Sequence, residues 1–88
     1  MATKAVLMHV SGRPYIVVLS SKGKILHANG PSLSLWYAVS SIRCGLPKWW
    51  DDDRLLPRFA AHPDEYRIVW RAGDPDSITA LREAAGQP

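Results

Sequence analysis

The sequence of 88 residues predicts one α+β domain, spanning residues 1–88, in which a mainly antiparallel four-stranded sheet packs its helices on one face. Short runs rich in β-branched residues predict the strands. Two segments with helical spacing of apolar residues predict the helices. The first three strands follow one another directly, so the order is βββα, a loop or short helix, then βα. A run of strands of this kind favours an antiparallel sheet.

The first strands form a predicted meander. Residues 5–10 (AVLMHV) and 14–20 (PYIVVLS) are joined by Ser11-Gly12-Arg13, which suits a tight turn between antiparallel strands. A second turn around Gly23 leads to a third strand over residues 25–28. The unbroken apolar run of residues 15–20 is typical of a central strand that is covered on both faces.

A helix is predicted to begin in the segment Asn29-Gly30-Pro31-Ser32 and to run to about Cys44. Asn, Gly and Ser can cap a helix, and Pro suits its first turn. Gly45 follows as a C-terminal cap. One face of this helix should pack on the sheet, and its apolar residues are Leu35, Trp36, Tyr37, Val39, Ile42 and Leu46.

The second half should add a short helix, a strand and a final helix. Pro57 limits any helix over residues 53–62 to a turn or two. Residues 65–71 (EYRIVWR) alternate, which places Tyr66, Ile68 and Trp70 on one side of a half-buried strand and Val69 on the other. An edge strand of this kind can pair with a second copy, so a homodimer is one expectation. The last helix starts at Asp74-Pro75 and ends at Gly86.

Charge is divided unevenly along the chain. The net charge of +3 combines six basic residues and no acid in residues 1–50 with five arginines and eight acids in residues 51–88. Such asymmetry can mark a polyanion-binding face, or the basic half can fold against the acidic half. The chain lacks an apolar run of membrane-spanning length and a cleavable leader pattern, so we expect a cytoplasmic protein.

Catalytic and metal-binding patterns are weak in this sequence. Cys44 has three histidines, His9, His27 and His62, as candidate bases, but its position in the last turn of a helix disfavours a thiolate, so we expect it to be a small buried residue. The triplet Asp51 to Asp53 lacks the alternating ligands of a calcium loop and predicts a solvated turn in which Asp53 caps the segment that follows. We therefore expect no enzyme activity, no metal and no cofactor.

The segment GLPKWWDDDR places two indoles side by side, and neighbouring residues diverge too far for both to enter one core. One of Trp49 and Trp50 should then remain at the surface, unless both fold over the core as a lid. Trp and Arg dominate protein interfaces. The leading hypothesis is a non-enzymatic regulator, inhibitor or adaptor that binds another protein through Lys48, Trp49, Trp50, Arg54 and Arg58.

A nucleic-acid-binding module is the alternative hypothesis. The basic half also holds aromatic residues that could stack on bases. The residues that would contact a polyanion are Arg13, Lys22, Lys24, Arg43 and Lys48.

The run Tyr15 to Asn29, followed by the helical residues Leu33 to Tyr37, resembles the opening of a PAS domain. The resemblance rests on a hairpin with Gly23 in its turn and on Asn29 before a helix. It implies a third hypothesis, a PAS-like fragment that senses a small molecule. A PAS core continues into three long strands, whereas here only residues 65–71 follow as a convincing strand, so the resemblance assigns no ligand or cofactor.

Overall fold

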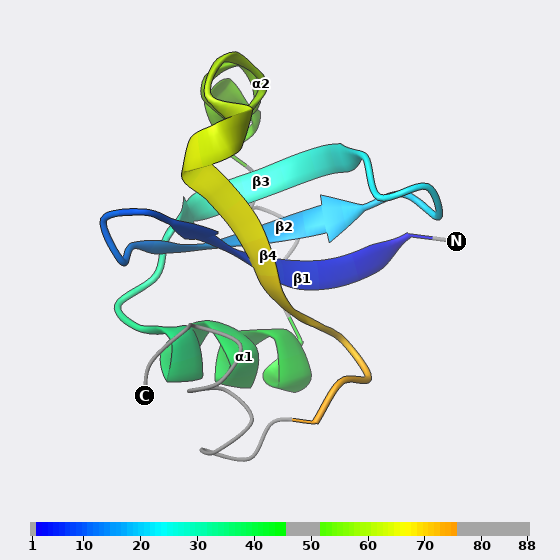
Figure 1. Cartoon of the computed structure of the whole chain (residues 1–88). Helices are drawn as coiled ribbons and strands as arrows, with labels where there is room; N and C mark the ends of the chain where they lie inside the picture. The colour runs from blue at the N-terminus through cyan, green and yellow to red at the C-terminus, as the bar shows by residue number, and fades with distance from the viewer. Residues whose placement is uncertain (1, 46–51, 76–88) are drawn as a thin grey trace.

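The computed structural model describes residues 2–45 and 52–75. Its four strands form one antiparallel sheet in the order β3-β2-β1-β4, with a helix on each side (Figure 1). This confirms the α+β class and the antiparallel sheet; the predicted final helix lies beyond residue 75, outside the described residues. The strands are β1 (Thr3–His9), β2 (Pro14–Leu19), β3 (Ile25–Pro31) and β4 (Tyr66–Arg71), and the helices are α1 (Leu35–Cys44) and α2 (Leu56–Ala61), with 3-10 turns η2 (Asp53–Leu55) and η3 (Pro63–Glu65) on either side of α2.

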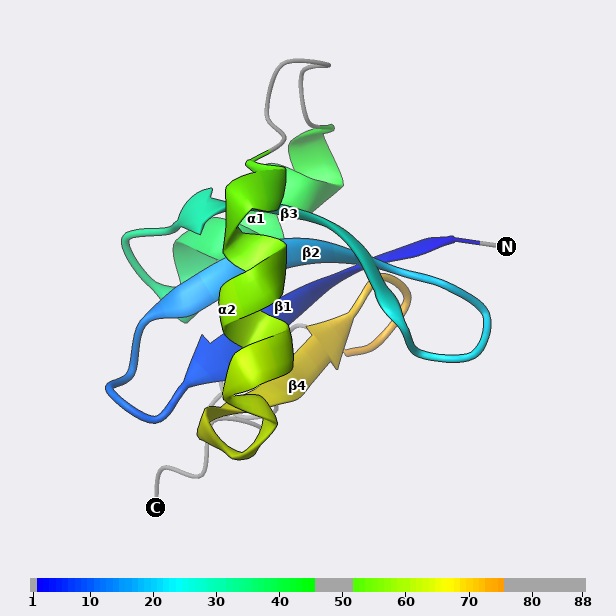
Figure 2. The same ribbon diagram turned by 90° about the horizontal axis from the view of Figure 1, so that it is seen from above.

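The two described helices lie on opposite faces of the sheet, so the expectation of one helical face is corrected. Figure 2 shows α2 lying across the strands on the near side and α1 on the far side. The reason is visible in β2, where both sets of alternating residues are apolar. Ile16 packs with α1, whereas Tyr15 and Val17 pack with α2. A strand that is apolar on both faces needs cover on both faces.

Helix α1 begins later than the sequence pattern predicts. Residues 29–31 continue β3, and Pro31 is the register partner of Tyr15 in β2. Ser34 is the N-cap, and its hydroxyl accepts a hydrogen bond of 3.1 Å from the Tyr37 amide. The predicted C-cap is confirmed: Gly45 has a φ of 87°, a left-handed value suited to glycine, and its amide donates to the Ile42 carbonyl.

Strict alternation in β4 is wrong beyond Ile68, because the strand contains a bulge. Val6 pairs with Trp70 and Leu7 pairs with Ile68, so Val69 is one extra residue in β4. The bulge turns Trp70 to the α1 side, where Val69 and Trp70 are both buried. Ile68 packs on the α2 side instead.

The segment before α2 is tied to β3. Asp53 accepts from the Ala28 amide at 3.3 Å and pairs with His27 Nδ1 at 3.1 Å, so its carboxylate does not cap the following helix. Pro57 stands in the first turn of α2, and the helix ends at Ala61 as the short length predicts. Among residues 2–45 and 52–75, no helix is long and apolar enough to cross a membrane.

Candidate functional site

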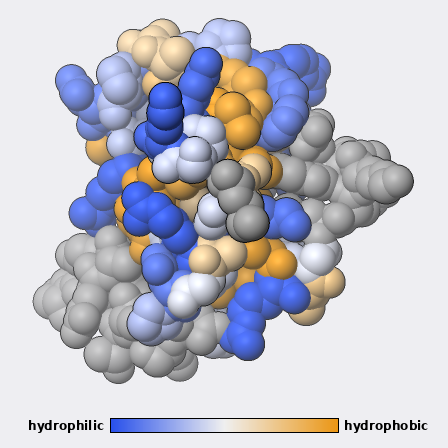
Figure 3. Space-filling view, turned by 90° about the vertical axis from the view of Figure 1, so that its right-hand side faces the viewer, coloured by the Kyte–Doolittle hydropathy of each residue, from blue (hydrophilic) through white to orange (hydrophobic). Residues whose placement is uncertain are grey.

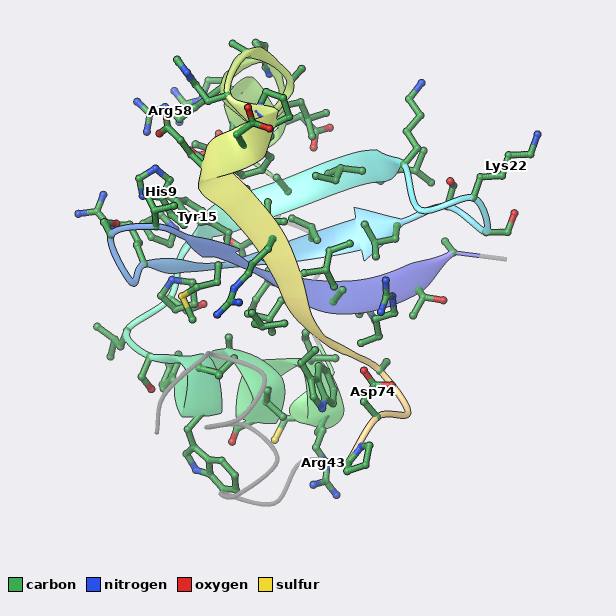
Figure 4. The ribbon with its side chains drawn as sticks, in the orientation of Figure 1. His9, Tyr15, Lys22, Arg43, Arg58 and Asp74 are labelled. Carbon is green, nitrogen blue, oxygen red and sulfur yellow. The ribbon has the colours of Figure 1, made fainter. Side chains whose placement is uncertain are left out.

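A cleft of about 300 Å³ opens where the turn between β1 and β2 meets α2, and we call it the hairpin-end cleft. Its side chains come from parts of the chain that are far apart in sequence and are brought together by the sheet. Figure 4 shows three of them, His9, Tyr15 and Arg58, at the same end of the molecule. The cleft is lined by His9, Ser11, Arg13, Tyr15, Arg58, His62, Glu65 and Tyr66.

Three aromatic rings pack together next to the hairpin-end cleft, and two of them, Tyr15 and Tyr66, line it. Phe59 of α2 is 5% exposed and meets Tyr15 of β2 with ring centroids 5.4 Å apart and Tyr66 of β4 with centroids 4.8 Å apart, both edge to face. Tyr15 and Tyr66 also meet edge to face, at 6.0 Å. These are the favoured geometries for aromatic pairs. The rings therefore fix the two phenols at the cleft.

Glu65 holds two imidazoles beside these rings. Its Oε1 lies 2.9 Å from His9 Nε2, and its Oε2 lies 3.4 Å from His62 Nδ1. The hydrogen bond from His9, with the nearby charges of the two histidines, lowers the pKa of Glu65 below its ordinary value of 4.5, although burial acts in the opposite direction. The carboxylate is thus engaged on both oxygens.

His9 also contacts Ser11 in the adjoining turn. Its Nδ1 accepts from the Ser11 amide at 3.1 Å and lies 2.8 Å from the Ser11 hydroxyl. Because an amide can only donate, Nδ1 is an acceptor and Nε2 carries the hydrogen that is donated to Glu65. Ser11, His9 and Glu65 are the groups of a hydrolytic triad. Here the amide competes for the Nδ1 lone pair, and the arrangement serves first to fix the turn.

Arg13 and Arg58 bring positive charge to the hairpin-end cleft. Both side chains are exposed, and neither makes an ion pair or a hydrogen bond with any residue in 2–45 or 52–75. Their field reaches Tyr66. Burial raises the pKa of the Tyr66 phenol and Tyr15 adds to that effect, whereas Arg58 and Arg13 act to lower it. Both arginines line the same cleft as Tyr66.

The predicted protein-contact patch is only partly described. Arg58 lines the hairpin-end cleft. The Arg54 side chain is 92% exposed, and its Nε donates to Asp52 Oδ1 at 2.9 Å, a bond that lowers the pKa of Asp52. Lys48, Trp49 and Trp50 lie outside the described residues, so the arrangement of the neighbouring indoles stays a prediction.

The basic residues of the nucleic-acid alternative lie at separate places. Arg13 is in the hairpin-end cleft, and Lys22 and Lys24 flank the turn between β2 and β3. Figure 4 shows Lys22 at the opposite end of the sheet from His9, and Arg43 beyond α1, near Asp74. Figure 3 shows the side with the turn between β2 and β3, where hydrophobic surface appears in patches between hydrophilic side chains. Lys48 is outside the described residues.

A second surface carries aromatic side chains that the sequence pattern assigned to the core. At the start of α1, Trp36 is 52% exposed, Tyr37 is 54% exposed and Leu33 is 87% exposed. We call these three residues the aromatic helix face. The helix packs on the sheet through Ala38, Val39 and Ile42 instead. The predicted apolar stripe is therefore too wide, and Trp36 and Tyr37 are corrected to surface residues.

Cys44 is also corrected, because the last residue of α1 is exposed and not buried. Helix α1 turns its buried side to the sheet through Val39 and Ile42, and the next residues along the chain, Arg43 and Cys44, point away from that side. In the described part of the chain, no group of three or more histidine, cysteine or acidic side chains is placed to hold a metal ion.

Comparisons with known proteins give no relative: no family model, no curated protein and no solved structure matches this chain.

Proposed function

We propose that this chain is a non-enzymatic domain that binds another protein as a regulator, inhibitor or adaptor, and that the aromatic helix face is part of its contact surface. The observation that carries the proposal is the exposure of Trp36 and Tyr37, each about half accessible at the start of α1. Adjacent exposed aromatic side chains on a small domain are a feature of binding surfaces.

The packing of α1 supports this reading. The helix packs on the sheet through Ala38, Val39 and Ile42, and about half of the surface of Trp36 and Tyr37 is left exposed. Trp and Tyr offer a large rigid area with few rotatable bonds, and burying them against a partner costs little conformational entropy. The predicted residues Lys48, Trp49, Trp50, Arg54 and Arg58 remain part of the proposal as a second patch.

Affinity capture with surface variants tests the proposal. The tagged chain, the double variant Trp36→Ser/Tyr37→Ser and the control Val10→Ser are incubated with a lysate of the source cells, with and without nuclease. Val10 is a matched control because it is an apolar residue that is 74% exposed and lies at the β1–β2 turn, away from α1. Any captured protein is then purified and its affinity measured by calorimetry.

The expected result is a partner that binds the unchanged chain and Val10→Ser but not the double variant, while all three chains melt at the same temperature. A loss of melting temperature in the double variant would mean that these rings stabilise the fold. Capture that disappears with nuclease would favour the nucleic-acid alternative. Single Trp49→Ala and Trp50→Ala variants in the same assay separate the second patch from the first.

A further inference from the structure

The hairpin-end cleft gathers two cations that have no counter-ion in the described structure. Arg13 stands just before β2, and Arg58 lies in α2, yet both line one cleft together with Tyr66. Neither makes an ion pair within residues 2–45 and 52–75. Two guanidinium groups near each other repel, and a bound anion would remove that repulsion. Arg is also the residue best suited to bidentate binding of oxyanions.

Glu65 is not the counter-ion of the two arginines. It is the one carboxylate that lines the cleft among the described residues, and its two oxygens are engaged by His9 at 2.9 Å and His62 at 3.4 Å. Its hydrogen bond goes to His9 and its ion-pair contact goes to His62, and neither guanidinium group is its partner in the described part of the chain. With neutral histidines, the lining keeps a net positive charge from its two arginines and one carboxylate.

The two phenols add neutral donors at the same place. Tyr15 is 3% exposed but lines the cleft, and Tyr66 is half-buried beside it. Neither hydroxyl makes a hydrogen bond with the described residues. Neither oxygen is a buried unpartnered atom, so each hydroxyl reaches the solvent in the cleft and is open to a ligand there. Because burial raises the pKa of Tyr66, this phenol keeps its proton at neutral pH and can donate it.

The donors fit a phosphate group better than a carboxylate. Two guanidinium groups and two hydroxyls present more donors than the two oxygens of a carboxylate can accept with good geometry, whereas a phosphomonoester has three terminal oxygens and a charge close to −2. The volume of about 300 Å³ also leaves room for the group to which the phosphate is attached, because a water molecule occupies only about 30 Å³ of liquid.

We propose that the hairpin-end cleft is a binding site for a phosphomonoester group, held by Arg13 and Arg58 and by the hydroxyls of Tyr15 and Tyr66. The proposal is independent of the aromatic helix face and of the identity of any protein partner. A phosphorylated side chain, a nucleotide and free inorganic phosphate share this chemistry, and the test below distinguishes them.

Titration followed by nuclear magnetic resonance tests the site. The full chain, labelled with ¹⁵N, is titrated separately with inorganic phosphate, O-phosphoserine and adenosine 5′-monophosphate, with unmodified serine as the negative control. We expect saturable shifts of the amides of residues 9–15 and 58–66 with the phosphate compounds and none with serine. The order of the three affinities identifies the source: equal affinities indicate an ion site, and tighter binding of one ester indicates recognition of its attached group.

Variants locate the binding in the cleft. Arg13→Gln and Arg58→Gln should each weaken binding about tenfold or more, since a charge-assisted hydrogen bond contributes on that scale. Tyr15→Phe and Tyr66→Phe keep the rings and remove only the hydroxyls, and each should weaken binding by about threefold to tenfold. The control Arg71→Gln removes an exposed arginine at the far end of β4 and should change affinity by less than about twofold.

Two results would overturn the proposal. One is the absence of saturable shifts with all three phosphate compounds. The other is an equal loss of affinity in Arg71→Gln and in the cleft variants, which would mean that the chain attracts anions only through its general charge. The ¹⁵N spectrum of each variant shows whether it is folded. We expect Arg13→Gln and Arg58→Gln to fold, since both side chains are exposed and neither contributes to the core.

Discussion

The two faces of the sheet are built from different side chains. The α1 face is mainly aliphatic, with Val6, Ile16, Val39 and Ile42 packed around Trp70. The α2 face is centred on the rings of Tyr15, Phe59 and Tyr66 and ends in a polar rim. The ten-residue helix α1 packs on its face through Ala38, Val39 and Ile42, whereas the six-residue helix α2 leaves an opening at its C-terminal end. A short helix over an aromatic layer thus yields both a core and a site.

The largest expected effect is on the α2 face. Phe59→Ala should lower the free energy of unfolding by about 3–5 kcal/mol, because it removes the ring that contacts both tyrosines and leaves a cavity under a helix of one and a half turns. Urea denaturation measures the change. Phe59→Leu is the control, and it should cost less because it refills most of the space. A loss below about 1 kcal/mol in Phe59→Ala would show that α2 contributes little to the core.

A smaller effect is expected on the α1 face, where Trp70 is 4% exposed and its buried Nε1 has no hydrogen-bond partner among residues 2–45 and 52–75. Trp70→Phe removes an unsatisfied donor as well as some apolar area. The two changes oppose each other, so stability should change by less than about 1 kcal/mol in the same assay. A loss of several kcal/mol would mean that the indole N–H has a partner in the folded protein.

A pH-dependent loss of stability is expected at Glu65 in the hairpin-end cleft, and not on the aliphatic face beside α1. The pKa of Glu65 is lowered in the folded chain, mainly by its bond to His9, so the charged form stabilises the fold above pH 4.5. That contribution is lost as the pH falls below 4.5 and the carboxylate is protonated. Denaturation curves between pH 7 and pH 3 should therefore show a steeper loss for the unchanged chain than for Glu65→Gln. Equal slopes would contradict the pairing.

The smallest effect is expected at the solvated pair of Arg54 and Asp52. The Arg54 side chain is 92% exposed, and water and salt screen such a pair. Arg54→Ala should leave the melting temperature unchanged within error at physiological ionic strength. A clear decrease would show that the segment before α2 depends on this bond.

The strands could be predicted from the sequence because β-branched runs and glycine turns are local signals. The start of α1 could not, because Asn29 to Pro31 carry cap-like residues but continue β3 through pairing with β2. The bulge at Val69 could not be predicted either, because the sequence of β4 alternates as in a regular strand. In both cases the pairing between neighbouring strands determined the local structure.

The hairpin-end cleft was predicted only in fragments. Arg58 and Arg13 were assigned to two different hypotheses, a protein patch and a nucleic-acid face, and the structure places both in one cleft. His9 and Glu65 were considered apart, because 56 positions separate them and only the antiparallel pairing of β1 with β4 brings them together. Trp36 and Tyr37 were assigned to the core because the helical spacing of apolar residues shows which residues share a face of the helix. It does not show how much of that face the sheet covers.

The bulge in β4 makes one strand a member of both layers. Tyr66 and Ile68 belong to the aromatic layer, and Val69 and Trp70 belong to the aliphatic one. A ligand that immobilises Tyr66 would therefore restrain the Trp70 indole beside α1 through the three residues that lie between them in β4. Slower hydrogen exchange of the α1 amides when a ligand fills the hairpin-end cleft would show that the two faces of the sheet are coupled.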